Sequence, residues 1–388
     1  MLGQKKMNFG FTEEQELLRQ TIRNLLEKEC PDEYIRKCDE EGLYPYEIQE
    51  KMVKIGLYGL PFPEKYGGTN GDVLDVVIVA EELGRKSYDL AAGYGLTIFA
   101  GQNLLKHGTE EQQSFYIPKI INGEIRLSVS ITEPDAGSDV ASMKTYAKPD
   151  GDYFIINGQK VFSTAAHAKN NIITLYCLTD LSVPPRKGMS AFLVDNKTPG
   201  MEIRKLRTIG RWVLGTNEIF ITDARVHKDC LLGRLNGGWS VLLSGLEYER
   251  IFTSAAYIGN AQTAVEEALA YALQRKQFGK EIGNFQVIAH MLADMQTEVD
   301  AARLLVYRAG WLHARGKPCL KEVSMAKLSC SETFAKVSNQ GMQILGGYGY
   351  IMEYNMQRYF RDSRITTISA GTSQMQRNII ARQMGLRP

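Results

Sequence analysis

The spacing of apolar residues changes twice along this chain of 388 residues. It is helical up to about residue 125, alternates as in β-strands up to about residue 233, and is helical again after Gly237-Gly238-Trp239. A strand-rich segment between two helix-rich segments is typical of separate packed layers rather than of a repeating βα unit. We therefore predict an α+β protein of three domains, covering residues 1–124, 125–234 and 235–388.

The first domain is predicted to be all-α. Thr12 followed by Gln15 has the pattern of a capping box, and apolar residues then recur at helical spacing. Further helices are expected near residues 47–55, 73–83 and 91–107, separated by breaks rich in glycine and proline.

The central domain is predicted to be a compact antiparallel β domain. Residues 153–156 run into Asn157-Gly158, and residues 160–164 follow. Asn-Gly between two such runs predicts a β-hairpin with its turn at this dipeptide. The remaining strands are expected at residues 127–131, 172–178, 191–194, 201–206 and 218–221.

The third domain is predicted to resemble a four-helix bundle. A long apolar stripe runs from Phe285 to Ala309 and is closed by Gly316 and Pro318. Helices of this length pack side by side, and the stripe could also be buried against another subunit.

Composition excludes several classes of partner. The net charge is +2 and shows no basic block, which argues against nucleic acid and a membrane surface as partners. No stretch is apolar for long enough to span a bilayer, and Met1–Met7 does not resemble a secretory signal. The six cysteines and five histidines lack metal-binding spacing, so we expect no metal and reduced cysteines. A cytoplasmic protein is expected, or a mitochondrial-matrix one if a transit peptide was removed.

The segment Ser244–Arg250 carries two carboxylates and a guanidinium in four residues. In a helix, Glu247 and Glu249 would point about 200° apart, so only one of them can face a given pocket. Taken alone, the segment also fits a solvated acidic turn on a surface helix.

Two segments of the β domain could form the walls of a flat pocket. The turn Thr132–Asp139 follows a strand and could present several backbone N–H groups to a phosphate or to the polar edge of a ring. In Phe162-Ser163-Thr164, an aromatic ring could stack and a hydroxyl could bind a ring nitrogen. Taken alone, the turn also fits an ordinary loop.

Three further motifs lie in the helical third domain. Arg275–Gly279 ends a helix, where basic residues also complement the helix dipole. Gln343–Tyr350 contains close-approach glycines but neither a dinucleotide fingerprint nor a P-loop. Gly371–Gln374 opens the last helix, with Thr372 or Ser373 as its cap.

The order and spacing of these motifs across nearly the whole chain resemble the acyl-CoA dehydrogenase family. The resemblance implies the cofactor FAD, an acyl-CoA substrate, electron-transferring flavoprotein as electron partner, and a homo-oligomer, usually a tetramer. It also implies FAD contacts in two groups, one from the β domain and one reaching a neighbouring subunit. The first group is Val129, Ile131, Thr132, Gly137, Ser138, Phe162, Ser163 and Thr164; the second is Arg275, Gln277, Phe278, Phe285, Gln286, Gln343, Gly346 and Gly347, with Thr372 and Gln374 as further contacts.

Within the resemblance, Thr164 would reach flavin N5, and Phe162 stands where a tryptophan is often found. The substrate contacts that it implies are Ser138, Glu247, Tyr248, Arg250, Ala370 and Gly371. Arg250 fits an anchor for a loop or the ligand better than a proton donor, because a guanidinium does not lose its proton at working pH.

One departure from the family pattern concerns the catalytic base. Many members carry a glutamate directly before the Gly-Thr-Ser turn, where this chain has Ala370. A subset similar to isovaleryl-CoA and long-chain dehydrogenases has its base at the position of Glu249. The resemblance therefore implies that Glu249 removes the α-proton of the acyl-CoA while flavin N5 takes the β-hydride.

Three alternatives remain open from the sequence. An enoyl-CoA reductase would run the reaction backwards, and the other two are a family member without catalysis and a monooxygenase-like relative. By family position, residues 89–95 would line the far end of the acyl pocket, with Ser369 beside the thioester. Small residues there leave room for a branched or cyclic acyl group, unless other side chains refill the space.

Overall fold

The computed structural model describes residues 10–387, so the predicted absence of a secretory signal at Met1–Met7 falls outside the described residues. The first part is helical, as predicted. The Thr12 and Gln15 side chains each accept the other's backbone N–H at 3.2 Å, which confirms the capping box. The helices are α1 (Glu13–Glu29), α2 (Asp32–Glu41), α3 (Tyr46–Lys54), α4 (Val73–Lys86), α5 (Tyr88–His107) and α6 (Glu110–Ile121), with short 3-10 turns η1 (Leu57–Gly59) and η2 (Glu64–Tyr66).

The central part is a sheet whose strands follow the order β6-β7-β3-β2-β4-β5-β8, with β1 paired to β4. The expected antiparallel arrangement is wrong at β4, because β1 runs parallel to it in register from Arg126↔Asn171 to Ser130↔Leu175, and β2 also pairs with it in parallel, at Tyr146↔Leu178. The intervening β2 and β3 supply the crossover that a parallel pair requires. The strands are β1 (Arg126–Ser130), β2 (Tyr146–Asp150), β3 (Tyr153–Thr164), β4 (Asn171–Leu178), β5 (Met189–Asp195), β6 (Met201–Leu206), β7 (Thr216–His227) and β8 (Leu231–Leu232).

The predicted hairpin at Asn157-Gly158 is also wrong, since both residues lie inside the continuous strand β3. The register against β7 shifts between Ile156 and Gly158, which marks a β-bulge. The Asn157 side chain donates to the Asp223 carboxylate at 2.9 Å and accepts the Asp223 N–H at 3.0 Å. The long-range partner therefore turns a local turn signal into a bulge, and the hairpin turn lies instead at Gly151, between β2 and β3.

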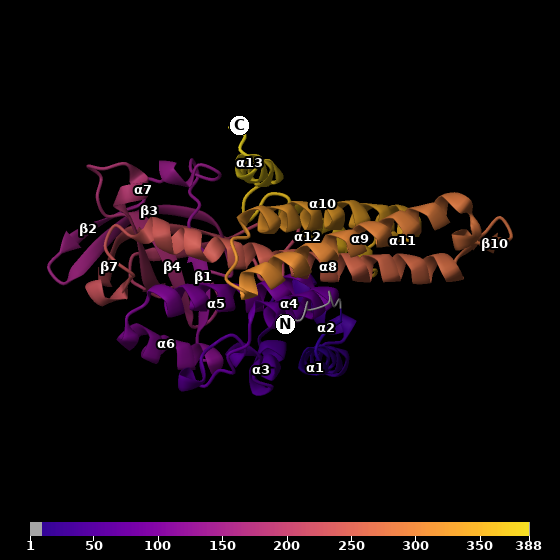
Figure 1. The fold of residues 1–388 in the computed structure, drawn as a ribbon, viewed down its shortest axis with the longest axis horizontal. Coiled ribbons are helices and arrows are strands. Elements are labelled where there is room, and N and C mark those ends of the chain that lie inside the picture. Colours follow the sequence, from indigo (N-terminus) through magenta and orange to yellow (C-terminus); the bar gives the residue numbers. More distant parts are fainter. Residues whose placement is uncertain (1–9, 388) are drawn as a thin grey trace, which may run out of the picture.

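The last part is a bundle of long helices. Figure 1 shows α8 running from the sheet at one end of the molecule to the β9–β10 hairpin at the other, with α9 and α10 beside it. Thr372 caps the last helix, because its hydroxyl accepts the Met375 N–H at 3.2 Å. The helices are α8 (Gly238–Gln274), α9 (Gln286–Ala314), α10 (Leu320–Leu345), α11 (Gly347–Tyr350), α12 (Met356–Thr366) and α13 (Ser373–Gln383), and the hairpin is β9 (Lys276–Gln277) with β10 (Lys280–Glu281).

Helix α8 joins the parts of the fold, because it packs on α4, α5, α9, α10 and α12. Its crossing with α4 is close: a Cβ on Gly259 would lie 2.0 Å from the Glu81 carbonyl oxygen, and one on Gly84 would lie 2.3 Å from the Ala256 carbonyl oxygen. Only glycine permits this approach, so the path of α8 between the domains is fixed.

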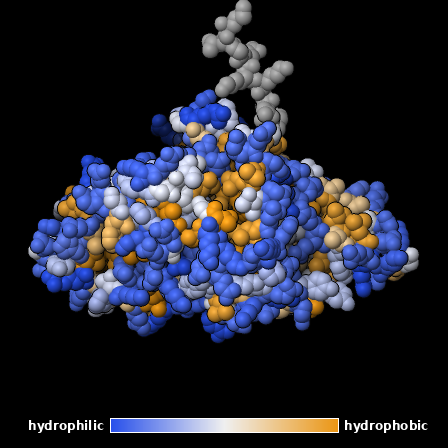
Figure 2. All heavy atoms as spheres, turned by 90° about the horizontal axis from the view of Figure 1, so that it is seen from below, coloured by the Kyte–Doolittle hydropathy of each residue, from blue (hydrophilic) through white to orange (hydrophobic). Residues whose placement is uncertain are grey.

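The face of the molecule seen from below in Figure 1 is mostly polar. Figure 2 shows hydrophobic patches scattered in a largely hydrophilic face. Among residues 10–387, no helix has the length and apolar character needed to cross a membrane.

Candidate active site

Glu249 lies on α8 where that helix passes between the sheet and the first helices. Two buried tyrosines lie near it, Tyr88 at the start of α5 and Tyr176 on β4. Burial raises the pKa of both tyrosines, and the negative charge of Glu249 adds to that rise. Glu249 is half-buried as a residue. Burial raises the pKa of Glu249, and the positive charges of Arg250 and Lys327 only partly oppose that rise. A carboxylate with a raised pKa is a better proton acceptor than an ordinary surface glutamate.

Glu247 faces a different part of the molecule. Its carboxylate accepts a hydrogen bond from the Cys319 thiol at 3.8 Å. Burial lowers the pKa of His313 on α9, and the charge of Glu247 only partly opposes that shift. Tyr248 is buried, with its ring 6.2 Å from that of His313. The helix therefore separates the two glutamates, as its period requires.

The turn between α12 and α13 is held against α8 through its backbone carbonyl groups. Arg250 Nε donates to the Ala370 carbonyl at 3.1 Å, which agrees with its predicted role as an anchor. Gln376 donates to the carbonyls of Ala370 and Gly371 at 3.1 and 3.0 Å. Ala370 has a φ of 53°, a strained value for a residue with a side chain. These bonds place the turn beside Glu249.

A buried lysine that the sequence analysis did not single out completes this turn. Lys327 on α10 is fully buried and donates to the carbonyls of Thr366 at 2.8 Å and Gly371 at 2.7 Å. Burial and the charge of Arg250 lower the pKa of Lys327 to about 8, while Glu249 opposes that shift. Its position was readable from the sequence, since it shares a helical face with Val323, Cys330 and Phe334.

A buried charge pair holds the loop after β1. The sequence analysis did not single out either of its residues. Lys160 Nζ lies 2.8 Å from Glu133 Oε1 and donates to the Ile131 carbonyl at 2.9 Å. Glu133 also accepts the backbone N–H groups of Lys144 and Thr145 at 2.6 and 3.0 Å. Burial acts to raise the pKa of Glu133, but Lys160 and these hydrogen bonds outweigh it, so the pKa is lowered.

The two predicted walls of the flat pocket lie next to each other. The Val161 N–H donates to the Thr132 carbonyl at 2.9 Å, and the Ser163 and Ser130 hydroxyls are 2.6 Å apart. Phe162 is 64% exposed at a φ of 59°, so the strand holds an aromatic ring outwards at a conformational cost. Val129, Ile131, Thr132 and Thr164 are partly exposed in the same region, and Gly137 and Ser138 lie on the exposed part of the loop.

The second predicted group lies elsewhere. An open pocket of about 500 Å³ is lined by Arg275, Gln277, Gly346 and Gly347, with the Arg275 guanidinium 5.8 Å from the centre of the Tyr348 ring. Gln286 and Gln343 are exposed, and the rings of Phe278 and Phe285 are 6.2 Å apart. Figure 1 places this end of the bundle opposite the sheet, so one chain does not bring the two groups together. Thr372 and the exposed Gln374 belong to the start of α13.

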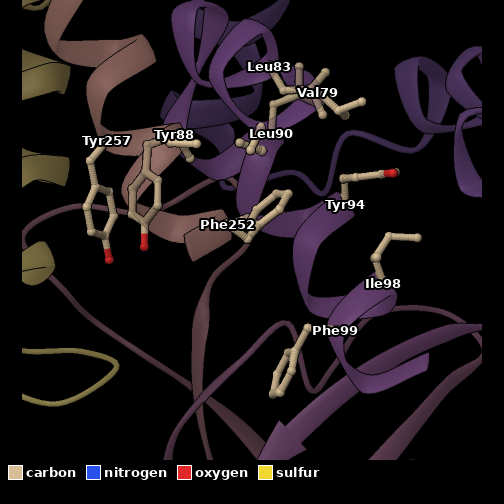
Figure 3. Close-up of a cluster of buried hydrophobic side chains, with 14 of the residues drawn as sticks. Val79, Leu83, Tyr88, Leu90, Tyr94, Ile98, Phe99, Phe252 and Tyr257 are labelled. Carbon is tan, nitrogen blue, oxygen red and sulfur yellow. The ribbon is translucent and has the colours of Figure 1, made fainter. Parts of the chain in front are cut away.

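The residues expected at the far end of the acyl pocket are tightly packed. Asp89 is buried, bonds Arg211 Nε at 2.7 Å and accepts the Leu214 N–H at 3.2 Å, so it ties α5 to a loop of the β domain. A Cβ on Gly95 would lie 2.1 Å from the Phe252 ring. Larger side chains therefore refill the space that the small residues of α5 leave, and Figure 3 shows Phe252 within this cluster.

Comparison with known proteins agrees with this architecture. Family models of the N-terminal, middle and C-terminal domains of acyl-CoA dehydrogenase match residues 12–124, 128–224 and 236–385. The chain is 41% identical to the caffeyl-CoA reductase-Etf complex subunit CarC of Acetobacterium woodii, over 96% of this chain and 98% of that protein. It is 35% identical to the short-chain specific acyl-CoA dehydrogenase of Clostridium acetobutylicum, over 97% and 99%.

A solved structure shows the same fold. The butyryl-CoA dehydrogenase of Megasphaera elsdenii superimposes with a TM-score of 0.93 at 31% identity, over 98% of this chain and 100% of that chain. Related flavoproteins were solved with their cofactor, among them the FAD complex of PigA at 27% identity and a TM-score of 0.92. The three domain matches and the whole-length identities show that this chain belongs to the acyl-CoA dehydrogenase family of FAD-dependent oxidoreductases.

Proposed function

We propose that the protein dehydrogenates an acyl-CoA thioester between its α and β carbons, with Glu249 as the base that removes the α-proton. The observation that carries the proposal is the position of Glu249 beside the turn at Ala370, with a pKa raised by burial. The sequence places no carboxylate at residue 370, and Glu247 faces the other side of the helix.

The residues present fit the FAD that the family uses. The exposed ring of Phe162 offers a stacking surface, and the Thr164 hydroxyl lies two residues further along the same strand. The Arg275 guanidinium and the open space at Gly346 and Gly347 suit a pyrophosphate, because charge and close backbone approach favour its binding. When bound, FAD accepts the hydride that leaves the β-carbon.

The side chains around Glu249 position the turn at Ala370. Arg250, Lys327 and Gln376 bind carbonyl groups of the turn and hold its backbone in one conformation. The turn can then direct the Ala370 N–H at the thioester carbonyl, where negative charge grows as the α-proton leaves. Glu249 would take that proton as the general base.

Glu249→Gln tests the base directly. Glutamine keeps the size of the side chain but cannot take the proton, so anaerobic single-turnover reduction of the flavin by acyl-CoA should slow by about 10²–10⁴-fold. Binding of the acyl-CoA, measured by perturbation of the flavin spectrum, should persist.

Glu247→Gln is the matched comparison, since it makes the same change two residues away on the other face of α8. Its rate of flavin reduction should fall far less. A crippled Glu247→Gln with a normal Glu249→Gln would contradict the assignment, as would two variants with wild-type rates.

A second candidate is the reverse reaction, reduction of an enoyl-CoA. In that direction Glu249 would return a proton to the α-carbon, so the same residue that serves as base in the dehydrogenation would serve as acid. Relatives named caffeyl-CoA reductase and acryloyl-CoA reductase (NADH) share 41% and 37% identity with this chain. Measuring the flavin potential against the saturated and unsaturated acyl-CoA couple would decide the favoured direction.

We further propose electron-transferring flavoprotein as the electron partner and a homo-oligomer, as a tetramer, as the working state. The absence of a nicotinamide-binding fingerprint in the sequence and the Etf complex of the relative CarC support the partner. Separation of the two FAD-binding groups at opposite ends of one chain supports the oligomer.

A further inference from the structure

The β6–β7 loop, residues 207–215, contains a buried residue in an uncommon backbone conformation. Arg211 has a φ of 63°, in the left-handed region that residues with a side chain seldom adopt. Its backbone N–H donates to Asp362 Oδ1 at 2.6 Å, and its Nε donates to Asp89 Oδ1 at 2.7 Å. Strain of this kind persists only where the surrounding structure holds it, and it is concentrated at functional sites. Two carboxylates from separate helices therefore keep Arg211 in this conformation.

Asp362 joins the β6–β7 loop to the turn at Ala370. It lies on α12, four residues before that helix ends at Thr366, and the turn follows directly. The loop and the helix approach closely, since a Cβ on Gly210 would lie 2.6 Å from the Arg361 carbonyl oxygen and 2.8 Å from Asp362 Oδ1. Only a residue without a side chain permits this approach, so the position of the loop against α12 is closely defined.

The other end of the loop holds the segment Phe162–Thr164. The Gly215 carbonyl accepts the N–H of Ala165, the residue after Thr164, at 3.0 Å. The Gly215 N–H in turn donates to the Arg211 carbonyl at 3.1 Å. Hydrogen bonds thus connect Arg211 to the end of β3, which we assign to the flavin ring.

Asp89 fixes the same loop from the side of the first helices. Its second carboxylate oxygen accepts the Leu214 N–H at 3.2 Å. The preceding residue, Tyr88, has its ring centre 4.6 Å from the Arg211 guanidinium and is one of the two tyrosines near Glu249. The loop is therefore held by α5, α12 and β3 together.

We propose that Arg211 and Asp362 are positioning residues of the reaction, because their contact sets the spacing between the flavin ring at the end of β3 and the thioester at the turn after α12. The inference rests on the proposed function, which places the flavin at Phe162–Thr164 and the thioester carbonyl at Ala370. Hydride transfer needs reacting atoms about 3–3.5 Å apart, and a misplacement of about 1 Å can slow a reaction about 10²-fold. A hydrogen bond between the two walls can therefore act on the rate of the chemical step without touching the substrate.

Two substitutions of Asp362 test the proposal. Asp362→Ala removes the acceptor of the Arg211 N–H, so flavin reduction at saturating acyl-CoA should slow by at least about tenfold. The dissociation constant of the acyl-CoA, taken from the concentration dependence of that anaerobic rate, should change by less than about threefold. Asp362→Asn keeps an oxygen acceptor and should stay within about twofold of the wild-type rate. Burial and the negative charges of Asp89 and Asp39 raise the pKa of Asp362 to about 7, so the site tolerates a neutral side chain.

Gly210→Ala is an independent variant that leaves Asp362 in place. It inserts a methyl group between the loop and α12, so it should slow flavin reduction at saturation by at least about tenfold. Glu82→Ala is the matched control for loss of a buried carboxylate. Glu82 accepts hydrogen bonds from Arg23 at 2.7 and 2.8 Å and joins α4 to α1 rather than the two walls. This control should lower the thermal midpoint but leave the rate per FAD-loaded enzyme within about twofold of wild type.

The outcomes separate the two proposals. If no acyl-CoA reduces the flavin of the wild-type enzyme, the proposed function fails and this inference fails with it. If the wild type is active, a normal rate in Asp362→Ala or equal losses in Asp362→Ala and Asp362→Asn would overturn only the inference. Equal rate losses in Asp362→Ala and Glu82→Ala would do the same, because the loss would then follow stability. If Asp362→Ala does not retain FAD, Gly210→Ala decides, and failure of both to retain FAD shows that the contact serves the fold and overturns the inference.

Discussion

Lys327 illustrates how one side chain can act on both the geometry and the electrostatics of the candidate site. It holds the carbonyls of Thr366 and Gly371, on either side of Ala370, from a fully buried position. Its positive charge also lowers the pKa of Glu249, against the effect of burial. A lysine with a pKa of about 8 keeps most of that charge at neutral pH and loses it above pH 8.

Lys327→Met should therefore change the pH dependence of flavin reduction as well as its rate. Without the positive charge the pKa of Glu249 rises further, so more of the base is protonated at a given pH. The acid limb of the single-turnover rate profile should move to higher pH, and the maximum rate should fall by about tenfold or more because the turn loses two hydrogen bonds. Lys327→Arg, which keeps the charge, should retain the wild-type pH limb. A uniform loss of rate with no displacement of the limb would mean that Lys327 serves only the structure.

The loop after β1 shows how an element is fixed by a pair of residues distant in sequence. Glu133 comes from the loop and Lys160 from the middle of β3, and their contact is almost fully buried. Because the loop includes Thr132 and leads into Ser138, the pair also sets one wall of the predicted flavin site. The pKa of Glu133 is lowered in the fold, so the stabilisation from its charge is present above the ordinary glutamate range and is lost as the pH falls through the folded value.

Lys160→Met should destabilise the β domain by about 3–5 kcal/mol, because it leaves the Glu133 carboxylate buried without its counter-charge. Adding Glu133→Gln should recover much of that loss, since the buried charge is then removed too. Urea unfolding followed by the fluorescence of bound FAD measures both the stability and the integrity of the loop. Equal stability of the single and double variants would show that the charge of Glu133 is compensated by other groups.

The arrangement of the complete molecule separates the groups that a single FAD would need. The exposed Phe162 belongs to the sheet, whereas Arg275 and Gly346 lie at the opposite end of the long helices in Figure 1. Phe162 and Glu249 lie at the same end of one chain, because the part of α8 that carries Glu249 begins beside the sheet. An oligomer in which the bundle end of one chain reaches the sheet of another would complete each site.

Mixing two inactive variants tests this arrangement. Glu249→Gln lacks the base, and Arg275→Ala should bind FAD weakly in its neighbour's site. In a mixed dimer, one site combines the intact Glu249 of one chain with the intact Arg275 of the other. Random pairing gives half mixed dimers with one good site of two, so co-refolded chains should recover roughly a quarter of wild-type activity. No recovery would indicate that both residues serve the same chain's site.

Many of the helices, strands and caps could be predicted from the amino-acid sequence. The periods of apolar residues predicted the helices and most strands, since periodicity depends only on which faces must be buried. The cap Thr12 was predicted correctly, and the cap of the last helix was predicted as Thr372 or Ser373, because a cap acts on backbone groups three residues away. The structure shows that Thr372 is that cap. The helical separation of Glu247 from Glu249 followed from the geometry of the helix alone.

Features that depend on partners far along the chain were not accessible in this way. Asn157-Gly158 carries a turn signal, yet Asp223, 66 residues away, holds it in a bulge. Packing between distant segments likewise sets the direction of β1 against β4 and the contact of Lys160 with Glu133. It also places the Phe252 ring in the space beside Gly95. Local periodicity states which face of a segment is buried, but not against what, and the chemistry of a site is set by what lies across that contact.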